Sequence, residues 1–467
     1  MNFKPPGSTA RKDRLGVLFL AVAFALAGWK IAERTPAGNF VPVVQQTAPS
    51  SGAARAGPNG PAAGGQAQPQ SSDQRLHLDA DFVSSSPGQA VHAASVVELR
   101  DGRLRAVWFS GSREGAANVA VKSAVTNAET LRWSEESTLY DRHRVQRGLW
   151  RYVKKIGNPV IARAPDGSLR LWMVTVSVGG WAGSSITWAR SDDEGATWSG
   201  PKRLVTSPFL NISTLVKGAP FFYDNGEIGL PVYHEFASKF GEILRISAQG
   251  KVLDKARIPG SQTQLQPVVL VDDATHAQVY MRSGHAVAVM ASETKDAGKT
   301  WSAAHALNWP NPDSALAAAV TANGQQWLAL NPGPKNREVL ALLQTGLGAS
   351  FDGVKPWVVE SAASPQTRLS IDDYERLLGE ELKASGVSET QTQAYVASAR
   401  RQLCVDKTCS EEFSYPYLLQ SRDGYLHMVY TWHRTRIKHV RLNPSQVFQS
   451  SQASPVTPAA MNHAATN

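Results

Sequence analysis

Short runs of alternating, β-branched and aromatic residues fill the middle of the chain, and turn residues separate them. Examples are "LRLWMVTVSV" from Leu169, "SITWARS" from Ser185, "AQVYMRS" from Ala277 and "AVAVMAS" from Ala286. Runs of this kind predict antiparallel strands. A unit of roughly 45 to 65 residues that holds four short strands is typical of a propeller blade. Residues 76–447 hold about six such units, so we predict an all-β fold, a six-bladed β-propeller.

One short box occurs twice between these runs. "SDDEGATWS" begins at Ser191, and "TKDAGKTWS" begins at Thr294. Asp accepts hydrogen bonds from amides ahead of it and Gly takes positive φ readily, so each box predicts a tight turn. The Trp that follows is long enough to hold the turn against the neighbouring sheet. We predict a structural role for Ser191, Asp193, Gly195, Thr197, Trp198, Asp296, Gly298, Thr300 and Trp301.

Basic residues precede an apolar run at the N-terminus. Lys4, Arg11, Lys12 and Arg14 come before "LGVLFLAVAFALAGW", which runs from 15 to 29. Because roughly 20 apolar residues cross a bilayer, residues 1–33 predict a cytoplasmic basic stub and a single transmembrane helix in the inner membrane. Cleavage after Ala27 is the alternative, and it would release a secreted protein. Either outcome exports the remaining chain, to the periplasm or beyond.

Two segments have the composition of disordered chain. Residues 34–75 are rich in Pro, Gly, Ala, Ser and Gln and lack hydrophobic periodicity, so they predict a disordered linker. Residues 448–467 have the same character and predict a loose tail. The folded domain is therefore expected within 76–447.

One insertion breaks the strand pattern. Residues 370–403 predict two helices, since Ser370 resembles a capping start, Gly386 ends the first helix and Ser388 starts the second. The chain's two cysteines, Cys404 and Cys409, follow directly and predict a local disulfide in an exported protein. Two thiolates leave a tetrahedral metal ion short of ligands, so we predict no metal and no cofactor. The insertion either covers a pocket, binds a partner or packs against the rim.

The formal net charge of +9 raises the question of an anionic partner. Export separates the chain from nucleic acid, and its basic residues are not interleaved with aromatic residues, so we exclude a nucleic-acid partner. An acidic carbohydrate or the membrane surface fits the charge. We expect the protein to be a monomer.

Polar residues recur where successive inner strands of the predicted propeller begin. In most cases Pro follows directly, and Pro restricts the residue before it to extended geometry, which would aim these side chains alike. Such a set, gathered around one axis, predicts a ligand site, although the same residues could simply begin strands and bond their neighbours. The residues are His92, Asn158, Lys217, Gln266 and Tyr415.

Further candidates lie where strands end. Because Arg binds carboxylates bidentately, Arg113, Arg282 and Arg434 predict a clamp for a sugar carboxylate. Glu114, Glu235 and Asp313 could supply an acid or a base. Asn331 is a candidate for substrate binding, and Tyr430 or Tyr415 for nucleophilic catalysis.

The repeated boxes resemble the Asp-box of the sialidase (neuraminidase) superfamily. Residues 191–198 match Ser-x-Asp-x-Gly-x-Thr-Trp in full, and 294–301 differ only by Thr in the Ser place. "HAASVVELRDGRLRAVWFSGSREG", "GNPVIARAPDGSLRLW" and "SYPYLLQSRDGYLHMVYTWHRTRIKHV" resemble the divergent BNR-repeat branch of that superfamily. The resemblance spans the folded region and implies a sialidase-like propeller with its Asp-boxes on the outer rim.

The same resemblance implies a chemistry, with one departure. Sialidases use a Tyr nucleophile paired with Glu, an Asp acid/base, and three arginines, the first of them in an Arg-Ile-Pro motif. This chain has "VHAAS" at that motif, so His92 stands in the Arg place. The departure leaves the specificity for sialic acid open.

These observations lead to one principal hypothesis and two alternatives. We predict a membrane-tethered, exo-sialidase-like glycosidase that acts on an acidic sugar or glycan outside the cytoplasm. The first alternative is a polysaccharide lyase, in which His92 or a Tyr removes the proton next to a uronate carboxylate. The second is a glycan-binding propeller without catalysis.

Overall fold

The computed structural model describes residues 16–23, 37–43, 79–207, 211–365 and 367–444. Residues 1–38 form one unit and residues 39–467 another. Residues 16–23 are helical. No helix among the described residues is long and apolar enough to span a bilayer. Most of the predicted anchor and linker, and all of the predicted tail, lie outside the described residues.

Within the described residues, the strands form six large antiparallel sheets, numbered here in chain order. The first contains β2 (Ala90–Glu98), β3 (Leu104–Gly111), β4 (Ala120–Val125) and β5 (Ser137–Asp141), and the second β6 (Lys155–Arg163), β7 (Leu169–Val176), β8 (Ser184–Ser191) and β9 (Lys202–Arg203). The third contains β10 (Leu215–Val216), β11 (Phe221–Phe222), β12 (Ile228–His234), β13 (Phe240–Ile246) and β14 (Val252–Arg257). The fourth contains β15 (Gln264–Val271), β16 (Ala277–Ser283), β17 (Ala288–Thr294) and β18 (His305–Pro310), and the fifth β19 (Ala317–Val320), β20 (Gln325–Leu330), β21 (Val339–Gly346) and β22 (Trp357–Ser361). The sixth contains β26 (Phe413–Gln420), β27 (Leu426–Trp432), β28 (Arg436–Leu442) and β1 (Asp79–Phe82).

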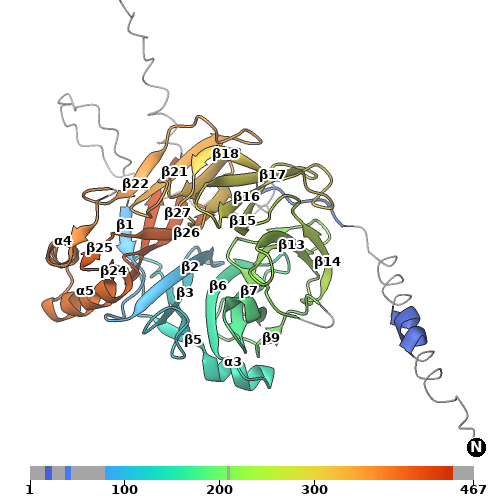
Figure 1. Cartoon of the computed structure of the whole chain (residues 1–467), viewed down its shortest axis with the longest axis horizontal. Helices are drawn as coiled ribbons and strands as arrows, with labels where there is room; N and C mark the ends of the chain where they lie inside the picture. The colour runs from blue at the N-terminus through green and yellow to red at the C-terminus, as the bar shows by residue number, and fades with distance from the viewer. Residues whose placement is uncertain (1–15, 24–36, 44–78, 208–210, 366, 445–467) are drawn as a thin grey trace, which may run out of the picture. The chain divides into compact units, whose positions relative to one another are not determined.

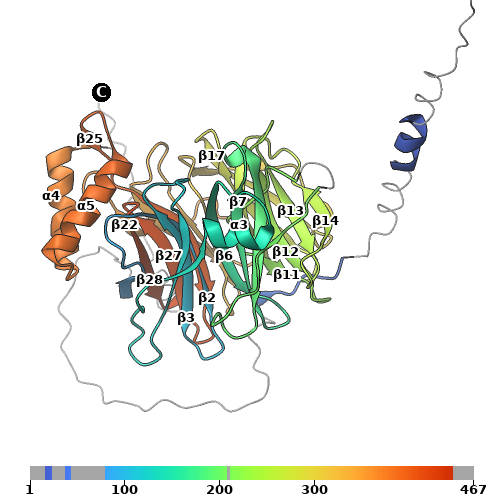
Figure 2. The same cartoon turned by 90° about the horizontal axis from the view of Figure 1, so that it is seen from below.

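The sheets are arranged around a common centre, which gives the 39–467 unit a propeller-like form (Figures 1 and 2). Neighbouring sheets contact one another through their first strands: β2 contacts β6, β6 contacts β10, β15 contacts β19, β19 contacts β26, and β26 contacts β2. The third and fourth sheets meet where β12 and β13 contact β15. β1, from the start of the folded region, completes the sixth sheet by pairing with β28, with Asp79 opposite Arg441. The fold is all-β, as predicted.

The sheets pack against one another through both of their faces. Every residue of β7 is buried, which explains why its sequence is almost continuously apolar and does not alternate. One hydrophobic cluster joins Trp108 of the first sheet, Trp172 of the second, Leu230 of the third and Val429 of the sixth. Close packing between sheets fixes the positions of the strand ends that carry the site.

Each Asp-box is a closed hydrogen-bonded turn. Asp193 accepts hydrogen bonds from the Thr197 amide at 2.8 Å and the Thr197 hydroxyl at 2.6 Å, and Ser191 Oγ accepts one from the Gly195 amide at 2.8 Å. The second box repeats these contacts around Asp296, with Thr294 Oγ1 in the Ser place, 3.0 Å from the Gly298 amide. A hydroxyl is all that this place requires, so Thr substitutes for Ser.

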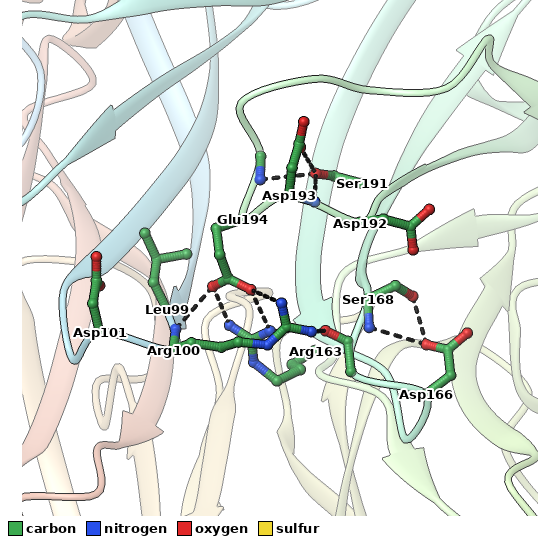
Figure 3. A network of polar contacts seen from close by, with 12 residues as sticks. Leu99, Arg100, Asp101, Arg163, Asp166, Ser168, Ser191, Asp192, Asp193 and Glu194 are labelled. Atoms are coloured by element: carbon green, nitrogen blue, oxygen red, sulfur yellow. Dashed lines mark hydrogen bonds and ion pairs between the residues drawn. The ribbon is translucent and has the colours of Figure 1, made fainter.

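The first box also ties the second sheet to the turn after β2 of the first sheet (Figure 3). Glu194, inside the box, accepts hydrogen bonds from the Arg163 guanidinium at 2.6 and 2.8 Å and from the Arg100 amide at 2.8 Å. Arg422 of the sixth sheet in turn donates to Glu98 and to the Leu99 carbonyl. The turn after β2 is therefore held from both neighbouring sheets.

The helices lie outside the sheets. α3 (Arg142–Leu149) follows β5, and η1 (Trp181–Gly183) follows β7. The insertion forms α4 (Ile371–Ala384) and α5 (Glu389–Leu403), which begin after the capping residues Ser370 and Ser388 as predicted. It ends in a small sheet of β23 (Leu369–Ser370), β24 (Cys404–Val405) and β25 (Thr408–Cys409), where Cys404 and Cys409 form a disulfide.

Part of the segment predicted to be a disordered linker is ordered. The Val41 amide donates to the Phe222 carbonyl, and Phe40, only 2% exposed, packs against Phe221 and Tyr223 with ring centroids 5.3 and 5.4 Å apart. The prediction failed here because composition averaged over the whole linker hides one aromatic anchor in "NFVPV".

Candidate functional site

Four first strands in the described part of the chain share a β-bulge near their start. In β6, Gly157 pairs with Val174 and Val160 with Trp172, so two residues of β6 oppose Met173 alone. The first extra residue of each bulge has positive φ: Ala93 54°, Asn158 43°, Gln266 50° and Tyr415 54°. A bulge re-aims a side chain, and positive φ is costly for residues with a Cβ. A strained feature that recurs at one end of the ring indicates a site there.

Two expectations about this register are wrong. Asn158, Gln266 and Tyr415 are not in extended geometry before their prolines, because the bulge places each of them at positive φ. His92 does not occupy the position equivalent to Asn158, Gln266 and Tyr415. That position in β2 belongs to the bulged residue Ala93, and His92, which precedes it, pairs with Phe109. The polar residues nevertheless converge at the end of the ring where the first strands begin, which we call the site face.

Tyr415 is at the centre of the polar cluster. Its phenol oxygen accepts hydrogen bonds from Arg282 Nη1 at 2.8 Å and from Gln266 Nε2 at 3.2 Å. Gln266 Nε2 also lies 3.4 Å from the hydroxyl of Tyr233, to which Asn158 donates at 3.2 Å. Arg282 reaches the cluster because β16 is antiparallel to β15, so that Arg282 pairs with Leu265 beside the bulge.

His92 is buried against Tyr415 without a polar partner. The two ring centroids are 3.9 Å apart, and His92 is 4% exposed. Neither ring nitrogen has a hydrogen-bond partner among the described residues. Burial, and then the nearby Arg434, lower the pKa of His92 well below its usual value, so the imidazole is neutral. The imidazole is therefore neutral and buried, and neither of its nitrogens has a protein partner within the described part of the chain.

Lys217 lies beneath the same ring. Its ammonium donates to the Pro416 carbonyl at 3.0 Å and lies 5.8 Å from the Tyr415 ring centroid and 5.6 Å from that of Tyr417. It is 2% exposed. Burial lowers the pKa of Lys217 to about 7, so this amine can gain or lose a proton near neutral pH.

Three arginines surround the cluster, and buried or half-buried carboxylates hold them. Arg282 Nε lies 2.6 Å from Asp313. Arg434 Nε lies 2.9 Å and Arg337 Nη1 3.3 Å from opposite oxygens of Glu412. The guanidinium carbons of Arg282 and Arg337 are 5.8 and 5.7 Å from the Tyr415 ring centroid.

Arg337 is the residue that sequence reasoning missed. It lies in the loop between β20 and β21, whereas the candidates chosen from the sequence lie where strands begin, where they end or directly after them. No strand pattern or proline marks its position. Arg113, proposed in its place, is exposed in the loop after β3.

Three carboxyl groups lie at the open side of the cluster. Burial raises the pKa of Glu235 above its usual value. For Asp313, burial acts in the same direction, but the hydrogen bond and charge of Arg282 outweigh it and lower the pKa. Glu114 is exposed and lies 3.5 Å from Arg434. Glu235 and Asp313 therefore have pKa values shifted in opposite directions within one site.

Two predicted site residues lie away from the cluster. Asn331 is fully buried and bonds the Ser314 hydroxyl and the Val339 and Phe413 carbonyls, so it joins strands. Tyr430 is buried in the hydrophobic cluster beneath α4, where its hydroxyl donates to Glu360 at 2.6 Å. Both side chains are engaged in the interior.

The ring has a different character at its opposite end. A cavity of about 390 Å³ is lined there by the later residues of the first strands, such as Val97, Ile161, Leu270 and Leu419, and by Val41 and Val43. The lining is mainly apolar. No cluster of three or more His, Cys, Asp or Glu side chains suited to a metal ion occurs in the described ranges at either end.

The sequence matches a known family model over most of the folded region. The model of the BNR repeat-like domain matches residues 102–428, which is more than half of the chain. The chain belongs to the BNR repeat-like domain family. The predicted membership of the sialidase superfamily, BNR-repeat branch, is thereby confirmed. A search of curated proteins found no match.

Solved structures share the fold of this BNR repeat-like domain at low sequence identity. A Dyadobacter fermentans protein of unknown function aligns with TM-score 0.58 and 11% identity, over 78% of this chain and 98% of that one. The Hadza microbial sialidase Hz136 aligns with TM-score 0.54 and 13% identity, over 76% and 66%. An intramolecular trans-sialidase from Ruminococcus gnavus, in complex with oseltamivir carboxylate, aligns with TM-score 0.54 and 11% identity, over 78% and 96%.

The BNR repeat-like domain of this chain has its own arrangement around the central tyrosine. The hydrogen-bond partners of the Tyr415 hydroxyl within the described residues are an amide and a guanidinium, and neither is a carboxylate. His92, from the first sheet, packs against the ring at an interplanar angle of 46°. Both hydrogen-bond partners are donors, so the phenol oxygen is the acceptor in both contacts.

Proposed function

We propose that this chain is a six-bladed propeller and a glycoside hydrolase that acts on an acidic sugar at the end of a glycan. In this proposal Tyr415 is the nucleophile, Glu235 is the general acid, and Arg282, Arg337 and Arg434 bind the sugar carboxylate. The observation that carries the proposal is the convergence of a tyrosine hydroxyl, three arginines and oppositely shifted carboxyl groups at one end of the ring.

The arginines support an anionic substrate. Guanidinium groups bind carboxylates bidentately, and planar recognition of this kind explains why arginines, rather than lysines, line the cluster. Arg337 and Arg434 keep 17% and 24% of their side-chain surface exposed, so they can reach a ligand without leaving Glu412. Asp313 and Glu412 hold the guanidinium planes before a substrate arrives.

The carboxyl groups support separate catalytic roles, one as a general acid and one as a base. Groups whose surroundings shift their pKa values in opposite directions are suited to opposite roles. Glu235, with its raised pKa, gives its proton to the leaving oxygen as the glycosidic bond breaks. Asp313, ionised beside the Arg282 that it shares with Tyr415, receives the phenol proton through water as the phenol oxygen bonds to the sugar carbon, and water then displaces the tyrosine. Arg282, which donates to the phenol oxygen of Tyr415, would stabilise negative charge on that oxygen as it attacks or leaves.

We also propose that residues 1–33 tether the enzyme to the inner membrane, with the propeller on the periplasmic side. The basic flank and the apolar run of the sequence support this location. Cleavage after Ala27 would give the same enzyme as a secreted protein.

Turnover of nitrophenyl glycosides of N-acetylneuraminate, glucuronate and galacturonate tests the function. Tyr415→Phe is expected to lower kcat/KM by at least about a thousandfold without changing the melting temperature. Glu235→Gln should spare nitrophenyl substrates, whose leaving group needs no proton, and slow natural disaccharides strongly. Full activity of Tyr415→Phe would exclude the nucleophile, and binding without turnover of any substrate would leave a glycan-binding protein.

The contact between His92 and Tyr415 favours a second candidate, a uronate lyase. A neutral imidazole against a phenol, with Lys217 close by, could remove the proton next to a carboxylate that the arginines neutralise. Such a reaction would produce an unsaturated uronate, which absorbs ultraviolet light. Appearance of that absorbance with polyuronates, and none with nitrophenyl glycosides, would select the lyase.

A further inference from the structure

The turn between β27 and β28 is strained, and it carries Arg434. The Thr435 amide donates to the Trp432 carbonyl at 3.2 Å, which closes the turn, and its two central residues, His433 and Arg434, have φ of 49° and 51°. Two positive φ values define a type I′ turn, whose central places are normally filled by Asn and Gly. His tolerates positive φ better than most residues with a Cβ, but Arg does not, and two such residues in succession require other contacts to hold them.

The helical insertion supplies a contact to the buried side of the turn. Tyr374, in the first turn of α4, lies with its hydroxyl 2.9 Å from His433 Nδ1, and both side chains are fully buried. Burial lowers the pKa of His433 to about 3, so the ring is neutral and Nδ1 can accept a hydrogen bond from the tyrosine. Phe413 and Trp432 pack against the same ring, with centroids 5.1 and 4.4 Å away. The contacts with Tyr374, Phe413 and Trp432 therefore fix the position of the His433 ring.

The opposite side of the turn faces the site. The Arg434 carbonyl accepts a hydrogen bond from the Val91 amide at 3.0 Å, next to His92, and the His433 amide donates to the Glu412 carbonyl at 2.7 Å. The Arg434 side chain then reaches Glu412 at 2.9 Å and Glu114 at 3.5 Å. One short turn thus connects the insertion, the first sheet and the arginine cluster.

We propose that Tyr374 and His433 are positioning residues, through which the insertion holds the strained turn so that Arg434 points into the site. This proposal rests on the proposed function for the role of Arg434 in binding a carboxylate. In this proposal the insertion supports the site from behind and does not cover it. In Figure 1, α4 and α5 lie beside β24 and β25 at the outer side of the sheets, which agrees with this role.

The test begins with crystal structures of two full-length variants. Tyr374→Phe removes only the hydroxyl that faces His433. Tyr395→Phe is the matched control, because Tyr395 is a buried tyrosine of α5 whose hydroxyl interacts with Arg436 and not with His433. We expect Tyr374→Phe to relax the turn and to separate Arg434 from Glu412, and Tyr395→Phe to leave both in place. An unchanged Arg434–Glu412 contact in Tyr374→Phe would overturn the proposal, whatever the substrate is.

Calorimetric titration with N-acetylneuraminate and glucuronate then tests the consequence for binding. We expect Tyr374→Phe to weaken binding about tenfold and to add nothing in an Arg434→Ala background, because both changes act through one group. Independent, additive losses would contradict the positioning role. No loss from Arg434→Ala alone would refute the carboxylate clamp of the proposed function, while the crystal structures would still decide whether Tyr374 positions Arg434.

A rescue variant separates positioning from a general loss of stability. Asn adopts positive φ more readily than His, so Tyr374→Phe/His433→Asn should restore the turn without the lost hydrogen bond. We expect the double variant to recover at least part of the affinity. Failure to recover any affinity, with Arg434 still displaced, would show that the turn is not what Tyr374 controls.

Discussion

Glu412 is the residue on which the electrostatic balance of the site depends. Burial acts to raise its pKa, but Arg434 and Arg337 outweigh burial and hold the pKa well below the usual range. We predict that Glu412→Gln lowers the free energy of unfolding by about 3 kcal/mol or more, because it removes the counter-charge of the largely buried Arg337 and leaves Arg434 with only the exposed Glu114. Urea unfolding followed by circular dichroism would measure the change.

Glu114 provides the matched control, because it contacts the same Arg434 from the exposed side at 3.5 Å. An exposed ion pair contributes little, so Glu114→Gln should change the free energy of unfolding by no more than about 0.5 kcal/mol. Equal effects of the two variants would mean that burial of Glu412 does not decide its importance.

Individual site residues were predictable from the sequence when they lay in a pattern that recurs at the beginning of the first strand of several sheets. Asn158, Gln266 and Tyr415 came from such starts, and Arg282 from the end of the partner strand, and the structure brings all four together. Tyr430 could not be separated from them, because β27 is buried on both faces and the sequence does not tell which face points to the centre. Arg337 could not be predicted, because the sequence of its loop has no recognisable pattern.

The Asp-boxes show, at the scale of the element, which atoms a turn requires. Thr294 Oγ1 accepts a hydrogen bond from the Gly298 amide at 3.0 Å and donates to Asp296 at 2.8 Å. We predict that Thr294→Val, which keeps the shape and removes the hydroxyl, costs about 1 to 3 kcal/mol of unfolding free energy, because a buried amide loses its acceptor. Thermal unfolding of the purified variant would measure this cost.

Thr294→Ser is the control for shape. It restores the residue found at the same place in the first box, so we expect a change within about 0.5 kcal/mol. A cost from Thr294→Ser as large as that from Thr294→Val would show that the methyl group, and not the hydroxyl, holds the turn.

Elements were predictable where local chemistry determines them. The strands, the Asp-box turns and the capped helices α4 and α5 follow from alternation, turn residues and serine caps in the sequence. The bulges do not, because a proline normally keeps the preceding residue extended and only packing between sheets reverses that preference at Asn158, Gln266 and Tyr415. The ordered residues 39–43 likewise depend on a pocket formed by distant strands.

At the scale of the molecule, the repeat of strand units indicated an all-β fold but not how its ends meet. The sixth sheet contains β1 from the beginning of the folded region and β26 to β28 from its end. A strand of four residues, "DADF", has no signal that assigns it to a sheet more than 350 residues later in the chain. We call the contact between the sixth and first sheets the seam. The stability of the propeller depends on this contact, because it joins the two ends of the folded region.

A hydrogen-bonded chain of neutral side chains crosses this seam. Trp133 Nε1 lies 3.4 Å from His439 Nδ1, His439 Nε2 lies 2.9 Å from His427 Nδ1, and His427 Nε2 lies 2.8 Å from the Ser421 hydroxyl, which donates to Asp423. Trp can only donate, so His439 must accept at Nδ1 and donate from Nε2, and His427 must do the same. Every ring nitrogen is used, and neither imidazole has room for a second proton.

Acid should therefore weaken the seam. Burial lowers the pKa of His427 to about 4 and that of His439 well below its usual value. In mildly acidic solution these two side chains therefore bind protons in the unfolded chain but not in the folded chain. The stabilisation is complete above the unfolded-state pKa of about 6.5 and is lost as the pH falls toward about 4. We predict that the protection factors of β1 and β28 amides, which correct for the slower intrinsic exchange in acid, fall over this pH range more than those of the second sheet. In His427→Gln/His439→Gln the seam should lose part of its stability at neutral pH and most of its pH dependence, because amides do not titrate. A pH dependence in that variant equal to the parent's would assign the acid sensitivity to other groups, of which the buried His92 and His433 are the candidates.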